Sequence, residues 1–202
     1  MVYIRKETEA DYFQAELMTK KAFWNLHHPG CDEHYLVHAL RDSADYLEEF
    51  SLVAECDGKI VGGIYYSKAW LEKDGTRTEI LNFGPLCVDP EYQNQGIGGR
   101  LLEESICLAK KSAYPGIVIF GEPGYYPKHG FKTCDHFGIT TKDGKNSDPF
   151  MGYELKEGAL SKIGGRYYES TVFDELFPEK VEEYDQMFPF MEKLKLPGQW
   201  ED

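Results

Sequence analysis

The chain has 202 residues, of which 42% are hydrophobic and 14% aromatic, so it can bury one substantial core, and general disorder is excluded. Its formal charge of −13 at pH 7 argues against nucleic acid as a partner, because phosphate binding needs a basic surface. No stretch reaches the roughly 18 apolar residues of a membrane helix and the start lacks a signal peptide, so we expect a cytoplasmic protein without membrane contact.

The first half of the chain mixes strands and helices. We expect a strand at residues 2–5, then a helix from a Thr8 cap to about Trp24, because an acidic residue follows Thr8 at the capping-box distance. Apolar spacing predicts a second helix over residues 32–47.

A strand pair follows. Residues 51–56 and 59–66 are rich in β-forming residues and flank Asp57-Gly58, a typical hairpin turn. A third strand over residues 80–88 contains Gly84-Pro85, a pair that predicts either a bulge or the parting of two strands.

The next segment predicts a βαβ unit. A helix begins near Gly98 and ends at Lys111, and the continuous apolar run at residues 116–120 is typical of a buried parallel strand. With further strands at residues 131–140 and 149–155, we predict an α/β fold with one mixed sheet.

The pattern changes near Ala159. We predict a short strand at residues 166–168 and an acidic helix at residues 178–187. Residues 157–202 are therefore expected to form a C-terminal extension that packs on the domain of residues 1–156 or on a partner subunit, as in a homodimer.

The five cysteines are odd in number and form no CxxC pair, which argues against a disulfide framework and a zinc ribbon. We expect them to be small core residues. They are Cys31, Cys56, Cys87, Cys107 and Cys134.

The segment with the strongest chemical signal lies between the third strand and the following helix. Its glycines Gly96, Gly98 and Gly99 let backbone amides converge on an anion, and the helix dipole and Arg100 favour a pyrophosphate. A Walker loop needs Lys-Ser/Thr after its last glycine, and a dinucleotide fingerprint needs a third glycine where Leu101 stands. Both alternatives therefore fail.

The loop resembles the Gln/Arg-x-x-Gly-x-Gly/Ala motif of the GNAT superfamily of N-acetyltransferases, which residues 93–98 match. A second family motif, Tyr-x-x-x-Gly-Phe, is matched by residues 126–131. Residues 81–86 and 121–126 resemble small bacterial members described as predicted N-acetyltransferases. The resemblance covers about residues 1–156.

The resemblance implies a GNAT fold in which the central strands splay apart at Gly84-Pro85, and acetyl-CoA or coenzyme A as cofactor. The alternative is a simple edge bulge. The residues expected to bind the cofactor are Leu86, Cys87, Val88, Gln93, Asn94, Gln95, Gly96, Ile97, Gly98, Gly99, Arg100, Tyr126 and Lys128.

Acetyl transfer from a thioester to an amine needs a neutral amine, an oxyanion donor and a proton for the leaving thiolate. In the family the proton donor is commonly the motif tyrosine, here Tyr126, whose alternative role is that of a core aromatic. Family members that acetylate histones place a glutamate where Asn82 stands, and Asn82 cannot accept a proton. Candidate substitutes for the base are Glu79, Glu122, His129 or a water chain.

A histidine-rich segment, residues 27–38, resembles a metal site in composition but lacks matching ligand pairs elsewhere, so we predict no metal. The family places its acceptor pocket here, so Glu33, His34 and His38 are predicted to contact the acceptor; otherwise they are solvated helix residues.

The predicted function is transfer of an acetyl group from acetyl-CoA to a primary amine of a small molecule or peptide by direct attack. A non-catalytic acyl-CoA-binding module is the alternative, suggested by Asn82. The acidic charge is compatible with a cationic acceptor without identifying it.

Overall fold

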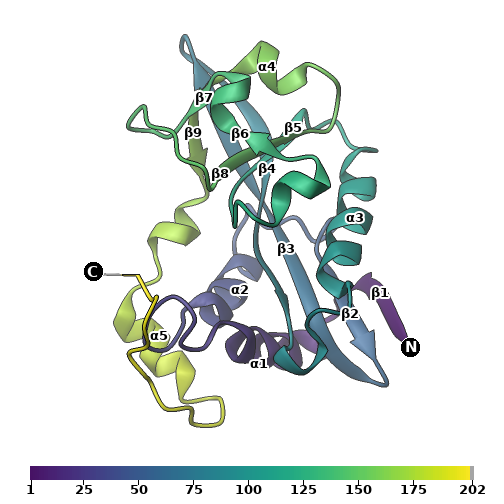
Figure 1. The fold of residues 1–202 in the computed structure, drawn as a ribbon, viewed down its shortest axis with the longest axis vertical. Helices are drawn as coiled ribbons and strands as arrows, with labels where there is room; N and C mark the ends of the chain where they lie inside the picture. Colours follow the sequence, from purple (N-terminus) through teal and green to yellow (C-terminus); the bar gives the residue numbers. More distant parts are fainter. Residues whose placement is uncertain (201–202) are drawn as a thin grey trace.

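Within residues 1–200, which the computed structural model describes, nine strands form one mixed sheet with helices on both faces (Figure 1). The strand order is β1-β2-β3-β4-β5-β8-β6, and β9 pairs with β3 and β7. The predicted α/β mixed sheet is confirmed. The strands are β1 (Val2–Lys6), β2 (Leu52–Cys56), β3 (Lys59–Lys73), β4 (Thr76–Val88), β5 (Gly116–Phe120), β6 (Lys132–Thr133), β7 (Ile139–Thr140), β8 (Phe150–Glu154) and β9 (Gly165–Glu169).

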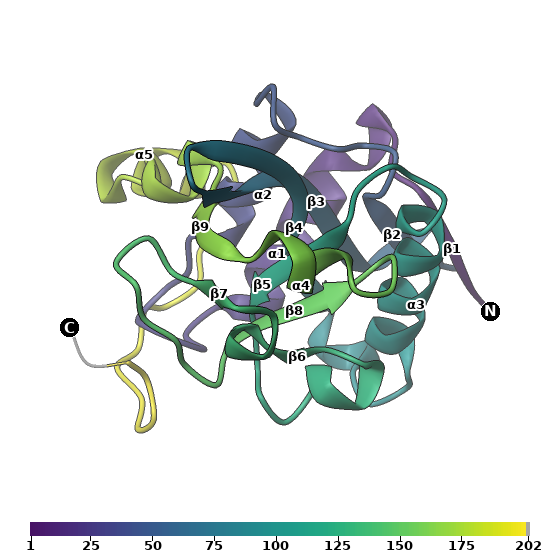
Figure 2. The ribbon, with the colours of Figure 1, turned by 90° about the horizontal axis from the view of Figure 1, so that it is seen from above.

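Helices cover opposite faces of this sheet (Figures 1 and 2). Leu101 and Leu102 of α3 pack with Tyr66, whereas Val37 of α2 packs with Tyr65, and neighbouring strand residues point to opposite faces. No helix within the described residues is long and apolar enough to cross a membrane. The helices are α1 (Tyr12–Phe23), α2 (Glu33–Arg41), α3 (Ile97–Ala109), α4 (Ala159–Ile163) and α5 (Pro178–Asp185).

Three predictions about the local structure are wrong. The second helix ends at Arg41, because Leu47 and Phe50 leave the helical path to enter the core, with the Leu47 amide bonded to the Tyr66 carbonyl (3.0 Å). The strand predicted over residues 131–140 is split by a short 3-10 helix, Cys134–Phe137. Cys107 is exposed on α3 rather than part of the core.

The predicted parting of strands is present next to Gly84-Pro85. Strand β4 pairs with the parallel β5 only at Leu81 and Ile117. The register of β4 on β3 shifts by one residue between Phe83 and Leu86, which is a β-bulge. Beyond Leu81 the edge of β4 that faces β5 is therefore unpaired, and the strands open as a V.

The C-terminal extension contacts two parts of the molecule. Strand β9 pairs with residues 69–72 of β3. Helix α5 and the segment after it lie against α1, α2 and the loop between them, in the lower left of Figure 1. Asn25 holds this segment, donating to the Glu192 carbonyl (2.9 Å) and accepting from the Leu194 amide (3.0 Å). The last two residues of the predicted extension lie outside the described part.

Candidate active site

The loop between β4 and α3 offers backbone amides at a helix start. Gly96 is the N-cap of α3 and has a φ of 78°, a conformation that glycine adopts without strain. The first helical bond runs from the Arg100 amide to the Gly96 carbonyl (3.1 Å), so the amides of residues 97–99 precede it and lack a partner one turn back. With the helix dipole, these amides form an anion cradle.

The glycines of the first turn also make room for neighbouring aromatic side chains. A Cβ at Gly98 would lie 3.2 Å from the Tyr125 hydroxyl, and one at Gly99 would lie 3.4 Å from Cε1 of His129. Glycine at these positions thus lets the side chains of Tyr125 and His129 lie close to the first turn of α3, and the glycines themselves place no side chain over its backbone amides.

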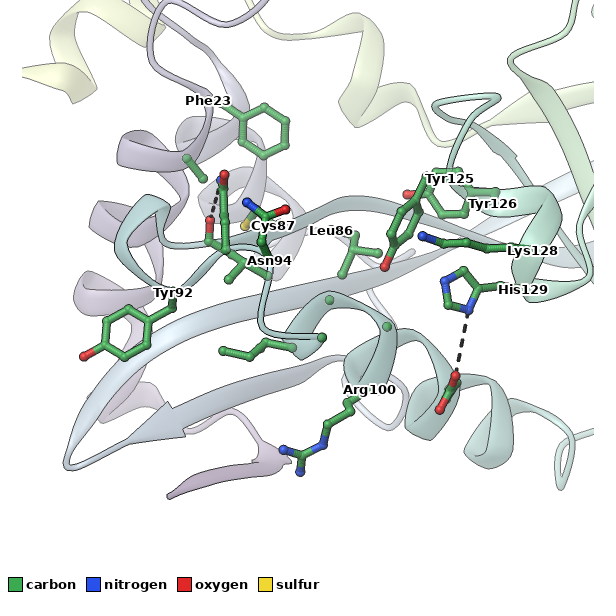
Figure 3. A pocket seen from close by; sticks show the side chains of 18 of the residues that line it. Phe23, Leu86, Cys87, Tyr92, Asn94, Arg100, Tyr125, Tyr126, Lys128 and His129 are labelled. Atoms are coloured by element: carbon green, nitrogen blue, oxygen red, sulfur yellow. Dashed lines mark hydrogen bonds and ion pairs between the residues drawn. The ribbon is translucent and has the colours of Figure 1, made fainter.

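The cradle opens into a cavity of about 780 Å³, within the size range of ligand sites (Figure 3). The cavity lies beside the V between β4 and β5. Its lining residues are Ala22, Phe23, Leu26, Leu86, Cys87, Val88, Tyr92, Gln93, Asn94, Gly96, Ile97, Gly98, Gly99, Arg100, Glu103, Tyr125, Tyr126, Lys128 and His129.

All the predicted cofactor-binding residues except Gln95 line this cavity. The Gln95 side chain instead faces the Glu91 carbonyl at 3.5 Å. The sequence motifs missed Phe23 and Leu26, which reach the cavity from the end of α1 and the loop after it. No local signal marks these two residues, since only the packing of α1 against β4 brings them to the site.

The cations at the cavity differ in direction. The Arg100 guanidinium approaches the Val2 carbonyl (3.4 Å) and Glu104 (3.9 Å), and in Figure 3 it points away from the other labelled side chains. Nζ of Lys128 lies 4.4 Å from the centre of the Tyr125 ring. Both side chains are exposed, but Lys128 lies against an aromatic ring that lines the cavity, whereas Arg100 is engaged by Val2 and Glu104.

Tyr126 is half-buried in an aromatic wall. Its ring centre lies 5.9 Å from that of Phe83 and 5.4 Å from that of Phe131, and its ring covers Gly121, where a Cβ would overlap it. Burial raises the pKa of Tyr126 above its usual range. The hydroxyl is therefore protonated at neutral pH and can donate a proton.

The base candidates named from the sequence occupy different places. Glu79 is exposed and accepts a hydrogen bond from Tyr114 (2.9 Å), and exposed Glu122 accepts one from the Gly124 amide (3.2 Å). Asn82 is buried on β4 opposite Ser67. Of the three candidate bases, Glu79, Glu122 and His129, only His129 lines the cavity, 3.9 Å from Glu103.

The residues predicted to contact an acceptor do not line the cavity. His34 is fully buried, with Nε2 3.3 Å from Asp185 and its ring against Tyr184 and Phe188 of the extension. Nδ1 of His38 lies 3.4 Å from Glu16. Glu33 is half-buried at the start of α2, and burial raises the pKa of its carboxyl to about 8.

Comparisons with known proteins agree on one family. Residues 48–133 match the acetyltransferase (GNAT) domain. The Escherichia coli (strain K12) protein described as the uncharacterised N-acetyltransferase YjhQ is 37% identical over 101 residues, 49% of this chain and 55% of YjhQ. The uncharacterised N-acetyltransferase YhbS of the same strain is 28% identical over 137 residues, 66% of this chain and 80% of YhbS.

Solved structures share the architecture over most of this chain. YhbS from Escherichia coli in complex with CoA gives a TM-score of 0.76 at 24% identity, over 86% of this chain and 92% of that chain. A GNAT family acetyltransferase from Brucella melitensis in complex with acetyl-CoA gives a TM-score of 0.69 at 27% identity, over 86% of this chain and 99% of that chain.

Residues 48–133 therefore match a GNAT acetyltransferase domain, in agreement with the resemblance that the motifs indicated. It spans about half the length of YjhQ, the first of these relatives.

Proposed function

We propose that this protein is an N-acetyltransferase that uses acetyl-CoA and transfers the acetyl group to a primary amine of a small molecule or peptide. The observation that carries the proposal is the joint position of the amide cradle, the strand opening and Tyr126 around one cavity. The family and the two ligand-bound relatives support the choice of donor.

The residues present fit coenzyme A. The amides of residues 97–99 would hold the pyrophosphate, since a Cβ at Gly98 would crowd this cradle. The unpaired edge of β4 next to Leu86 would hydrogen-bond the pantetheine arm. When bound, acetyl-CoA supplies a thioester as the activated acetyl group. Tyr126, whose hydroxyl is protonated at neutral pH, would give its proton to the leaving sulfur.

The direct test is release of free thiol from acetyl-CoA by the full chain across a panel of polyamines, aminoglycosides and lysine peptides. We expect at least one amine to accelerate thiol release, with the acetylated product identified by mass. Thermal stabilisation by acetyl-CoA without thiol release for any amine would contradict the proposal and favour a binding module.

A further inference from the structure

The end of α1 and the loop after it form an apolar wall of the cavity. Phe23 and Leu26 line the cavity from this side. Phe23 packs on a cluster that includes Cys87 of β4, and Leu26 is 53% exposed. A ligand in the cavity can therefore bury apolar surface of both side chains, which favours binding.

This wall lies across β4 from the amide cradle. Leu86 of β4 packs toward the cluster that contains α3, whereas Cys87 packs toward α1. Figure 3 shows Phe23 and Arg100 on opposite sides of Cys87. The edge of β4 that would hydrogen-bond the pantetheine arm lies between these two sides, so the arm would pass beside Phe23 and Leu26.

The loop after α1 is bonded to the end of the chain, residues 192–200, which we call the strap. Nε1 of Trp24 and Nδ2 of Asn25 both donate to the Glu192 carbonyl at 2.9 Å. The Leu194 amide donates to Oδ1 of Asn25 at 3.0 Å. The first part of the strap thus holds the turn by which the chain leaves α1.

The last part of the strap holds the backbone on either side of Leu26. Nε2 of Gln199 donates to the Asn25 carbonyl (2.9 Å), and the Trp200 amide donates to the His27 carbonyl (2.8 Å). The ring of Trp200 also stacks on His27, with the ring centres 4.2 Å apart. Asn25 and His27 are the chain neighbours of Leu26, so these contacts fix its position.

From these contacts we infer that the strap is a positioning element of the cofactor site, which holds Phe23 and Leu26 in place for the pantetheine arm of coenzyme A. The inference rests on the proposed function. Within residues 1–200, none of the cavity-lining residues belongs to the strap, so the strap acts through the loop. Ordering a loop and its side chains on binding lowers affinity, and a wall that is already held avoids this loss.

The experiment measures by calorimetry how the full chain binds two ligands. They are CoA and 3′-phosphoadenosine 5′-diphosphate, the part of CoA that lacks the pantetheine arm. The strap variant combines Gln199→Ala with Trp200→Ala and leaves the loop sequence intact. We expect its Kd for CoA to rise about three- to tenfold, the effect of having to order one or two side chains. Its Kd for the nucleotide should stay unchanged.

The matched control is Phe190→Ala, because Phe190 is 91% exposed on the same extension but lies outside the strap. This variant should bind both ligands as the wild-type chain does. Trp200→Phe keeps an aromatic ring against His27 and should also retain the wild-type Kd. Gln199→Ala alone should give part of the rise, and it tests the inference if the double variant folds poorly.

A double-mutant cycle with Leu26→Ala separates positioning from a merely structural role. Leu26→Ala alone should raise the Kd for CoA, because it removes part of the wall. If the strap acts through this wall, the strap changes should have a smaller effect in the Leu26→Ala background than in the wild-type chain.

An unchanged Kd for CoA in the strap variant would overturn the inference. An equal rise for the nucleotide, or effects that multiply in full in the cycle, would do the same. With a wild-type chain that binds CoA, these results leave the proposed function unaffected. A wild-type chain that does not bind CoA would instead refute the proposed function, and the role of the strap with it.

Discussion

The Tyr126 ring lies among aromatic rings, and its hydroxyl is protonated at neutral pH, where the proposed reaction needs an acid. We predict that Tyr126→Phe lowers kcat for thiol release between 10²- and 10⁴-fold, since phenylalanine keeps the ring and loses the proton. The KM for acetyl-CoA should change little. Tyr125→Phe is the matched control, and equal losses in both variants, measured by steady-state kinetics, would argue against Tyr126 as the acid.

Gly98 lies in the first turn of α3, where the absence of a side chain leaves room for the cofactor. A side chain there meets the Tyr125 hydroxyl and the Val88 side chain, so Gly98→Val should fill the cradle. We predict a rise of about tenfold or more in the Kd for CoA, which corresponds to about 1.4 kcal/mol, measured by calorimetry. Gly124→Ala has only an ordinary contact nearby and should bind as the wild-type chain does. An unchanged Kd in Gly98→Val would place the pyrophosphate elsewhere.

At the scale of elements, α5 is held to α1 and α2 by buried charge. The Lys20 side chain is 1% exposed and its Nζ lies 2.6 Å from Asp185, which also faces His34. The histidine-rich segment resembled a metal site in composition. In the structure, its helical part packs against the C-terminal extension, where His34 faces Asp185. Within residues 1–200, no group of three or more possible ligands is placed to hold a metal ion.

Asp185→Ala should be strongly destabilising, because it leaves the Lys20 ammonium buried and unpaired. Breaking such a pair costs about 3–5 kcal/mol, which urea unfolding can measure. Glu182→Ala removes only an exposed contact with Lys193 and should cost less than about 1 kcal/mol. Similar unfolding midpoints for the two variants would contradict the packing of α5 described here.

The pH dependence of stability should report on His34. Burial lowers its pKa to about 4, with Asp185 opposing that shift, Lys20 reinforcing it, and Cys31 and Tyr184 against the ring. A depressed pKa stabilises the fold above the unfolded value of about 6.5, and this contribution is lost as pH falls from there toward 4. The slope is at most about 1.4 kcal/mol per pH unit.

We therefore predict that His34→Gln loses less free energy of unfolding than the wild-type chain between pH 7 and pH 4.5. Urea titrations of both proteins at the two pH values measure the difference. Parallel losses would mean that His34 is not titrating in the folded state.

For the whole molecule, the sequence predicted those parts of the site that are contiguous. The cradle and Tyr126 follow from short motifs whose glycines have a local steric reason. The environment of His34 was not predictable, because Asp185 is far away in the sequence and local spacing carries no record of it. The hydrogen bonds of Asn25 were not predictable for the same reason, since its partners Glu192 and Leu194 come from the far end of the chain.

The end of α2 shows why a local sequence pattern does not fix where a helix stops. The helical spacing over residues 32–47 continues past Arg41, but burial of Leu47 and Phe50 in the core opposes it. Tertiary burial decides such boundaries, and helix propensity is a weak term beside it.

We propose that one cavity binds acetyl-CoA with its pyrophosphate on the amides of residues 97–99 and its thioester in the opening between β4 and β5. A crystal structure of the full chain with acetyl-CoA tests this most directly. We predict phosphate oxygens within hydrogen-bond distance of those amides and the thioester between Leu86 and Tyr126. A pyrophosphate away from the start of α3, or a thioester outside the opening, would contradict the account.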